Sequence, residues 1–343
     1  MDRRRKRVYF IVSDEGISSA ARSAMVANEV VRRGADVVFQ TRDPLATVAP
    51  LLSPKVATVR RFNLSLLARR GGVVDREATV EAFAGYEERL SAWASEMASS
   101  PDVAAADVVV SDVVEEAGAL HDALGVPVVF VSNSTWHWTL RKIDGRLDPV
   151  AGAKESHLAK AREFMYPPFS VDPDSFPHRS AIPVISRRRR DPFALREELG
   201  VDAWQPVLVT DGWTCAEAGV RLDCRPWLIV DRGGLGGGLA GFLDYVNVAD
   251  LVVSRGGYSA IADTVAAGVR HLIVEEDGNP ESKACADLAE AAHRALRCTW
   301  AQFAEDPEGW VEDSLLADLD LDPMPAYGAG VVASRVLELA SSR

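Results

Sequence analysis

The sequence predicts an α/β protein built from doubly wound parallel sheets, and three observations support this. Short strands rich in Val and Ile alternate with helical segments along most of the chain. Several of the helical segments end at a glycine, which is typical of helix C-termini. The length of 343 residues exceeds what one ordinary core supports and indicates two domains.

The first half opens with a strand–helix–strand unit. Residues 8–12 form an apolar strand, a polar turn follows, and the apolar residues of 20–33 fall at helical spacing before Gly34. The same alternation continues beyond this unit. We expect further strands at 36–40, 106–111 and 127–131, and helices at 76–98 and 115–124.

The pattern changes near the middle of the chain. Helical and strand periodicity weakens over 139–180, and prolines gather between 167 and 183. Such a segment favours an interdomain crossing at which the domains could hinge. A helix then begins at Asp191-Pro192 and ends at Gly200. We therefore expect one domain at 1–183, a second at 184–326, and a C-terminal helix within 327–343.

Composition and charge narrow the class of protein. Hydrophobic residues make up 48% and charged residues 26%, which is typical of soluble globular proteins. The formal net charge of −12 argues against a general nucleic-acid-binding protein, which would be basic. The apolar run after the basic leader covers only 8–12. A secretory signal needs roughly 7–15 apolar residues and a membrane span about 20, so we expect neither here.

The cysteines indicate neither a zinc site nor a disulfide framework. No pair has Cys-x-x-Cys spacing, and no cluster of histidines joins them. Reduced thiols in a cytoplasmic protein are the simplest interpretation. The four cysteines are Cys215, Cys224, Cys285 and Cys298.

The strongest functional pattern lies at 249–290. A strand at 251–253 leads through a Ser-Arg-Gly-Gly turn into a helix at 259–267, and a second strand precedes an acidic loop. Backbone N–H groups at such a helix start can hold phosphate, and an arginine adds a bidentate donor. The alternatives are a glycine pair used only for tight packing and a solvated loop. We expect these ligand-binding residues: Ser254, Arg255, Gly256, Gly257, Tyr258, Glu276, Asp277, Asn279 and Glu281.

This segment resembles the nucleotide-sugar-binding signature of GT-B glycosyltransferases. Asp263 matches an acidic residue of the signature helix, residues 266–268 match its Ala-Ala-Gly end, and Ser282 stands where Gln is usual. Residues 132–138 are similar to the Ser-Asn-Phe-Thr-Trp-Asp-Trp motif of glycosyltransferase-like proteins related to the N-terminal part of L-arabinokinases. The resemblance covers about 8–290 and includes no kinase motif.

The resemblance implies a GT-B fold, with two Rossmann-like doubly wound domains facing a central cleft. The C-terminal domain would bind a UDP-sugar or other NDP-sugar, the N-terminal domain would bind a small-molecule acceptor, and the C-terminal helix would cross back. The implied reaction is glycosyl transfer, inverting and metal-independent, with no cofactor besides the nucleotide-sugar co-substrate. Neither nucleic acid nor stable membrane insertion is expected, and a homodimer stays open.

The general base of the predicted reaction is open among four candidate residues. Related enzymes carry Gly-x-Gly-His-Ala-x-Arg-Ser after the first strand, with the His as base, and here Ser19 stands in its place while Arg22 and Ser23 are retained. Asp14 or Glu15, at the end of the first strand, could replace it. Asp112 and His137 are the other candidates, and for all four the alternative is a turn, packing or solvent role.

Other departures keep further functions open. The strand that ends at 210 leads into a turn with one glycine, Gly212, where related enzymes have two. The glycine run at 233–238 is more typical of a flexible loop than of a phosphate site. The arginines at 187–190 could attract a diphosphate or an acidic acceptor, but a solvated face is the commoner meaning of such a run. A nucleotide-sugar hydrolase or epimerase, or a non-catalytic binding protein, therefore stays an alternative.

Overall fold

The computed structural model divides the chain into two compact units. The N-terminal unit comprises Met1–Ile185 and Tyr327–Arg343, and the C-terminal unit comprises Ser186–Ala326. The structure describes residues 4–13, 18–42, 49–61, 63–64, 67–70, 73–176, 178–186, 190–210, 227–231, 244–275 and 278–342. Within these ranges, no helix is both long enough and apolar enough to cross a membrane.

The N-terminal unit contains a seven-stranded parallel sheet in the order β3-β2-β1-β6-β7-β8-β9. Its strands are β1 (Arg7–Val12), β2 (Asp36–Thr41), β3 (Ala57–Arg60), β6 (Val108–Asp112), β7 (Val128–Val131), β8 (Glu163–Tyr166) and β9 (Arg179–Ala181). Strand β1 pairs with β2 on one side and with β6 on the other, so the strand order reverses between β1 and β6. Ligands of open parallel sheets bind outside the carboxyl ends of the strands at such a switch point.

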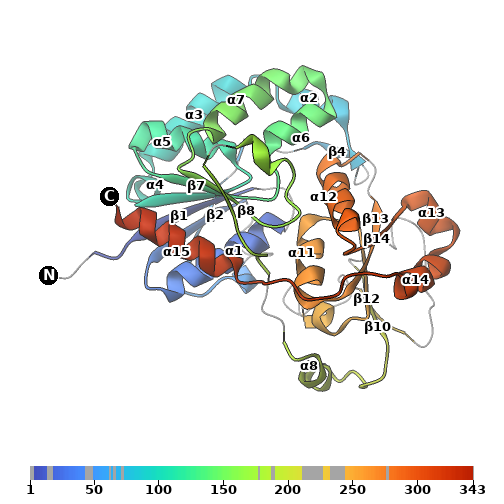
Figure 1. Cartoon of the computed structure of the whole chain (residues 1–343). Helices are drawn as coiled ribbons and strands as arrows, with labels where there is room; N and C mark the ends of the chain where they lie inside the picture. The colour runs from blue at the N-terminus through green and yellow to red at the C-terminus, as the bar shows by residue number, and fades with distance from the viewer. Residues whose placement is uncertain are drawn as a thin grey trace. The chain divides into compact units, whose positions relative to one another are not determined.

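Helices cover both faces of this sheet (Figure 1). They are α1 (Ser18–Arg32), α2 (Arg76–Ala82), α3 (Tyr86–Ser99), α4 (Pro101–Ala104), α5 (Gly118–Leu124), α6 (Trp136–Ile143), α7 (Asp148–Leu158) and α15 (Gly328–Ser341), and a short antiparallel pair joins β4 (Arg69–Arg70) to β5 (Val73–Val74). Helices α1 and α15 pack on one face, and α3, α5, α6 and α7 on the other. Short 3₁₀ turns lie at Ala49–Leu51, Glu115–Ala117, Gly145–Leu147 and Pro173–Ser175.

The last helix, α15, belongs to the N-terminal unit although it follows the C-terminal unit in sequence. Its residues Val332, Val336 and Leu339 join the apolar core formed with α1 and the sheet. Arg33, just after α1, adds a hydrogen bond from Nη2 to the carbonyl oxygen of Gly330 at 3.0 Å.

Two sequence predictions are wrong in this unit. The helix expected at 76–98 is broken into α2 and α3, because Gly85 adopts a left-handed conformation (φ 64°) between them. The segment 167–183 is no interdomain crossing, since it connects β8 to β9 within the first sheet and the unit ends at Ile185. The elements around it include a helix of eight residues and strands of four and three, which are too short to produce clear periodicity.

The C-terminal unit contains a five-stranded parallel sheet in the order β11-β10-β12-β13-β14. Its strands are β10 (Val207–Thr210), β11 (Leu228–Asp231), β12 (Leu251–Ser254), β13 (Arg270–Glu275) and β14 (Leu296–Thr299). Its helices are α8 (Pro192–Leu199), α11 (Tyr258–Ala267), α12 (Pro280–Ala291), α13 (Trp300–Glu305) and α14 (Pro307–Leu316). Alternate residues of β12 face opposite sides, so that Val252 packs with Ala267 of α11, and Val253 with Phe303 of α13.

Candidate functional site

The turn at 254–257 connects the carboxyl end of β12 to the N-terminus of α11. Gly256 has φ 75°, and a Cβ atom there would lie 2.6 Å from Cγ2 of Ile273, so the fold requires glycine. Gly257 is the N-cap of α11 at φ −58°, and no described heavy atom lies within 4 Å of where its Cβ would be. Of the two glycines, only Gly257 therefore borders open space beside the helix start.

A buried histidine lies beneath this turn. His271 of β13 is 1% exposed, and burial lowers its pKa to about 3. Its Nε2 lies 2.8 Å from Oγ of Ser254, and its Nδ1 lies 3.2 Å from Oγ1 of Thr264. Oγ of Ser254 also accepts a hydrogen bond from the backbone N–H of Gly256 at 3.2 Å. The sequence pattern predicts a strand at His271 and assigns the residue no role, although a single histidine in an apolar strand is itself a signal of a buried polar contact.

The other expected ligand residues that the structure describes lie after β12 or after β13, at the start of the helix that follows each strand. Oδ1 of Asn279 caps α12 by accepting from the N–H groups of Glu281 (3.2 Å) and Ser282 (3.3 Å). Its position after β13 places it at the carboxyl edge of the sheet, as with the turn after β12. Tyr258 is buried and Arg255 is half-buried.

Asp263, the acidic residue of α11, accepts a hydrogen bond from Oγ of Ser186 at 2.5 Å. This contact ties α11 to the segment that opens the C-terminal unit. Arg190, the described member of the arginine run, lies 2.5 Å from Glu198 and 3.7 Å from Asp244, as expected for a solvated face.

In the N-terminal unit, a buried ion pair lies at the switch point between β1 and β6. Asp112 ends β6, and its backbone oxygen accepts from the N–H of Ser13, the first residue after β1, at 3.0 Å. Arg22 of α1 donates to both Asp112 carboxylate oxygens, from Nε at 2.9 Å and from Nη2 at 2.6 Å. Ser23 adds a third bond to Asp112 at 2.9 Å, and Arg22 reaches Oδ1 of Asn133 at 2.7 Å.

This arrangement bears on Asp112 as a candidate base. Burial raises the pKa of its carboxyl, and hydrogen bonds from Arg22, Ser23 and Ser19 oppose that shift. The Asp112 side chain is fully buried, and both of its oxygens accept hydrogen bonds from Arg22. This geometry suits a role in which Asp112 positions Arg22. Arg22 and Ser23 match the related motif in sequence, but the motif does not reveal their partner Asp112, which lies 90 positions from Arg22.

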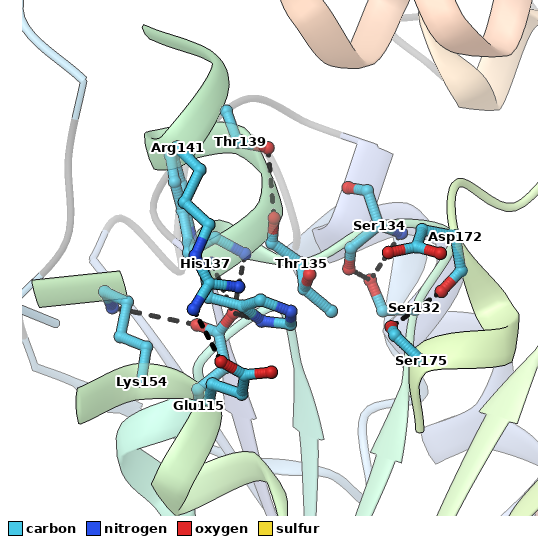
Figure 2. Close-up of polar contacts among 12 residues, drawn as sticks. Glu115, Ser132, Ser134, Thr135, His137, Thr139, Arg141, Lys154, Asp172 and Ser175 are labelled. Carbon is cyan, nitrogen blue, oxygen red and sulfur yellow. Dashed lines mark hydrogen bonds and ion pairs between the residues drawn. The ribbon is translucent and has the colours of Figure 1, made fainter. Parts of the chain in front are cut away.

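His137, another candidate base, lies at the start of α6 (Figure 2). Its ring is 2% exposed, packs edge-on against Phe176 with centroids 5.6 Å apart, and places Nδ1 3.8 Å from Oε1 of Glu115. The same Glu115 oxygen accepts from the N–H groups of Trp136 at 2.6 Å and of His137 at 3.3 Å. The side chain of Glu115 thus caps α6, and His137 packs behind that cap.

The hydroxyl side chains of Ser132, Ser134 and Thr135 lie in the turn before α6 (Figure 2), and all three are buried. Oγ of Ser132 donates to the carbonyl oxygen of Ser134 at 2.6 Å, which folds the chain tightly after β7. The side chains of Ser134 and Thr135 are 1% and 3% exposed. The motif that carried the resemblance in this half therefore forms a closed, hydrogen-bonded turn at the carboxyl end of β7.

Glu115, which caps α6, also belongs to a buried cluster of charged side chains. Nζ of Lys154 lies 2.5 Å from Oε1 of Glu116 and 3.7 Å from Oε2 of Glu115, and all three side chains are at most 1% exposed. Tyr86 donates to the same Glu116 oxygen at 2.9 Å, and burial raises the pKa of its hydroxyl. Val113, between Asp112 and this cluster, has φ 56°, a strained conformation for a β-branched residue.

Several expected residues lie outside the described ranges. They are Asp14, Glu15, Glu276 and Asp277 of the predicted sites, the one-glycine turn at 211–214, the glycine run at 233–238, Arg187–Arg189 of the arginine run, and two cysteines, Cys215 and Cys224. Cys285 and Cys298 are both buried. Within the described part of the chain, no group of three or more His, Cys, Asp or Glu residues is placed to hold a metal ion.

Solved structures of glycosyltransferases match nearly the whole chain. The glycotransferase of kitacinnamycin aligns with a TM-score of 0.61 at 16% identity, over 98% of this chain and 99% of its own. VinC in complex with dTDP aligns with a TM-score of 0.61 at 16% identity, over 98% and 100%. UGT2 of Phytolacca americana, complexed with UDP-2-fluoro-glucose and pterostilbene, aligns with a TM-score of 0.57 at 15% identity, over 98% and 94%.

These alignments, together with the two parallel sheets of seven and five strands, show that the chain has the GT-B fold. The predicted fold class is thereby confirmed. The sequence identities to these structures are 12–16%, so the similarity is evidence for the fold alone. No protein-family model matches the chain, and no curated protein matches its sequence.

Proposed function

We propose that this chain is a glycosyltransferase that moves a sugar from a nucleotide-sugar donor, a UDP-sugar or another NDP-sugar, to a small-molecule acceptor. In this proposal the unit Ser186–Ala326 binds the donor and the unit Met1–Ile185 binds the acceptor. Structures with the same fold are complexed with dTDP or with UDP-2-fluoro-glucose and pterostilbene, which supports both ligand classes.

The observation that carries the proposal is the open space at Gly257. A diphosphate that binds at a helix N-terminus must approach the backbone N–H groups without meeting a side chain. Gly257 occupies the N-cap of α11 at the carboxyl end of β12, and a Cβ there would contact no described atom. In the transition state the leaving diphosphate gains negative charge, which the helix dipole and Arg255 would stabilise.

Asn279 and Glu281, with Glu276 and Asp277, are the proposed contacts of the ribose or donor sugar. Oδ1 of Asn279 caps α12, and its amide group carries two further N–H donors. A carboxylate accepts hydrogen bonds from sugar hydroxyls, which suits the three acidic residues. We propose that the reaction inverts the anomeric carbon and proceeds without a metal, as in the enzymes that the sequence resembles.

For the general base we propose Asp14 or Glu15, which follow Ser13 directly in sequence. The other two candidates are buried, Asp112 in its pair with Arg22 and His137 behind the cap of α6. Replacing the true base should lower turnover by about 10²–10⁴-fold while nucleotide affinity stays nearly unchanged. Asp14→Asn and Glu15→Gln test this, and wild-type turnover in both variants would contradict it.

The direct test of the function is a turnover assay. The purified chain is incubated with UDP- and dTDP-sugars, with and without a panel of phenolic acceptors that includes pterostilbene, and products are followed by mass spectrometry. The proposal predicts release of the nucleoside diphosphate only with an acceptor, and an acceptor product heavier by one sugar. Release of the nucleotide without any acceptor would instead identify a hydrolase.

A second candidate is a protein that binds a nucleotide sugar without transferring it. Two observations favour it: Ser19 replaces the expected histidine, and the nearby Asp112 carboxylate is engaged by Arg22. Nucleotide binding in the absence of turnover with any donor and acceptor would select this alternative.

A further inference from the structure

His271 is absent from the ligand residues proposed above, yet it contacts the turn at 254–257. It lies on β13, where its pairing partner in β12 is Val252. Alternate residues of a strand share a face, so His271 lies on the same side of the sheet as Ser254, two residues after Val252. The ring is closed off from solvent and hydrogen-bonded at both nitrogens.

The hydroxyl of Thr264 determines which ring nitrogen carries the proton. Oγ1 of Thr264 lies 2.9 Å from the carbonyl oxygen of Ala260 and 3.0 Å from that of Ile261, and its single proton is donated to these acceptors. With its proton assigned to these two carbonyl oxygens, Oγ1 of Thr264 accepts from Nδ1 of His271, 3.2 Å away. Burial keeps the ring neutral, so Nε2 carries no proton and is an acceptor.

The hydrogen-bond direction then continues into the turn. Oγ of Ser254, 2.8 Å from Nε2, must donate its proton to His271. Its lone pairs are left to accept from the backbone N–H of Gly256 at 3.2 Å. Thr264, His271, Ser254 and Gly256 thus form one relay in which every donor and acceptor is assigned.

We propose that His271 is a positioning residue of the nucleotide-diphosphate site, acting through Ser254 to hold the turn at 254–257 in the conformation that receives the diphosphate. This inference rests on the proposed function. The relay fixes Gly256 in its left-handed conformation, and the next residue is the N-cap Gly257 of α11. Without an acceptor at Nε2, the Ser254 hydroxyl would turn elsewhere and release the Gly256 N–H.

Two replacements of His271 separate hydrogen bonding from packing. His271→Leu fills a similar volume with an apolar side chain and removes the hydrogen-bond acceptor. His271→Gln instead keeps an oxygen that can accept from Ser254. Ser254→Ala removes the middle of the relay. Ser314→Ala is the matched control, because Ser314 is also a fully buried hydroxyl of this unit but bonds the carbonyl oxygen of Trp310 in α14.

The measurement is the Kd for UDP and for dTDP by isothermal titration calorimetry, with urea unfolding of each variant beside it. We expect about tenfold weaker binding for His271→Leu and for Ser254→Ala, equal to the loss of about 1.4 kcal/mol. The double variant should bind no more weakly than either single variant, since both act through one relay. His271→Gln should restore most of the affinity, and Ser314→Ala should bind as the wild type does.

The outcomes separate this role from the proposed function. Wild-type affinity in folded His271→Leu or in Ser254→Ala would overturn the positioning role while the donor site stands. Losses that add in the double variant would likewise overturn it, because His271 would then act independently of Ser254. Wild-type protein that binds none of UDP, dTDP, GDP, ADP and CDP would overturn the proposed function and this role with it.

Discussion

Replacing Arg22 by methionine should strongly destabilise the N-terminal unit. Arg22 gives Asp112 two hydrogen bonds at 2.6 and 2.9 Å, and both side chains are at most 3% exposed. Removing the guanidinium would leave a buried carboxylate without its ion-pair partner, held by hydroxyl groups such as that of Ser23. Breaking a buried pair from one side costs about 3–5 kcal/mol, and we expect this loss for Arg22→Met.

The double variant Arg22→Met/Asp112→Leu sharpens this prediction. It leaves no unpaired charge, so it should be more stable than Arg22→Met although it contains one more substitution. Both are measured as free energies of unfolding in urea, followed by circular dichroism. The control is Arg32→Met on the same helix, because Arg32 forms an exposed pair with Glu29 and its loss should leave the midpoint almost unchanged. A loss below about 1 kcal/mol for Arg22→Met would refute a charged, buried pair at the switch point.

Three further predictions concern stability. Gly256→Ala should cost about 1–2 kcal/mol for its left-handed conformation and about 1–3 kcal/mol for the overlap with Ile273, and a urea midpoint equal to that of wild type would contradict this. The pKa of His271 is about 3 in the folded state and 6.5 in the unfolded state, so between pH 3 and 6.5 only the unfolded state binds the proton. The free energy of unfolding should therefore fall with decreasing pH in this range, by up to about 1.4 kcal/mol per pH unit. This part of the slope should be missing from unfolding curves of His271→Leu, and equal slopes would count against a neutral buried ring. Lys154→Met should cost about 3–5 kcal/mol in the same assay, because it leaves Glu116 buried without its cation, and a neutral effect would show that the cluster tolerates the loss.

Much of the fold could be predicted from the sequence because its central strands are short, apolar and bounded by glycines or polar turns. The unit from β12 to β13 is the clearest case: the expected helix at 259–267 is found as Tyr258–Ala267, and Gly268 ends it at φ 70°. The predictions failed at 76–98, where Gly85 divides the expected helix, and in places where elements are short. Strand β9 has three residues and α6 has eight, and neither provides enough repeats of a period to stand out.

The candidate site was only partly predictable for a different reason. The glycine pair at 254–257 is a local pattern, so its position between strand and helix could be read from the sequence. The partners that hold the site are remote in sequence. Arg22 meets Asp112 across 90 positions and Ser254 meets His271 across 17, and only the sheet order brings them together.

The central claim is that a nucleoside diphosphate binds at the start of α11, and Gly257→Val tests it most directly. The substitution adds a side chain where a Cβ would meet no described atom and where φ is −58°, so the protein should fold with nearly wild-type stability. Gly152→Val, at a glycine of α7 with similarly open space, is the matched control.

Binding of UDP and dTDP is measured by calorimetry and by thermal shift, where ligand at about 100 times its Kd stabilises wild type by roughly 2.7 kcal/mol. We predict that Gly257→Val loses this stabilisation and the binding heat, because its side chain occupies the approach of the phosphate to the N–H groups of α11, while Gly152→Val retains both. Unchanged nucleotide affinity in folded Gly257→Val would contradict the claim.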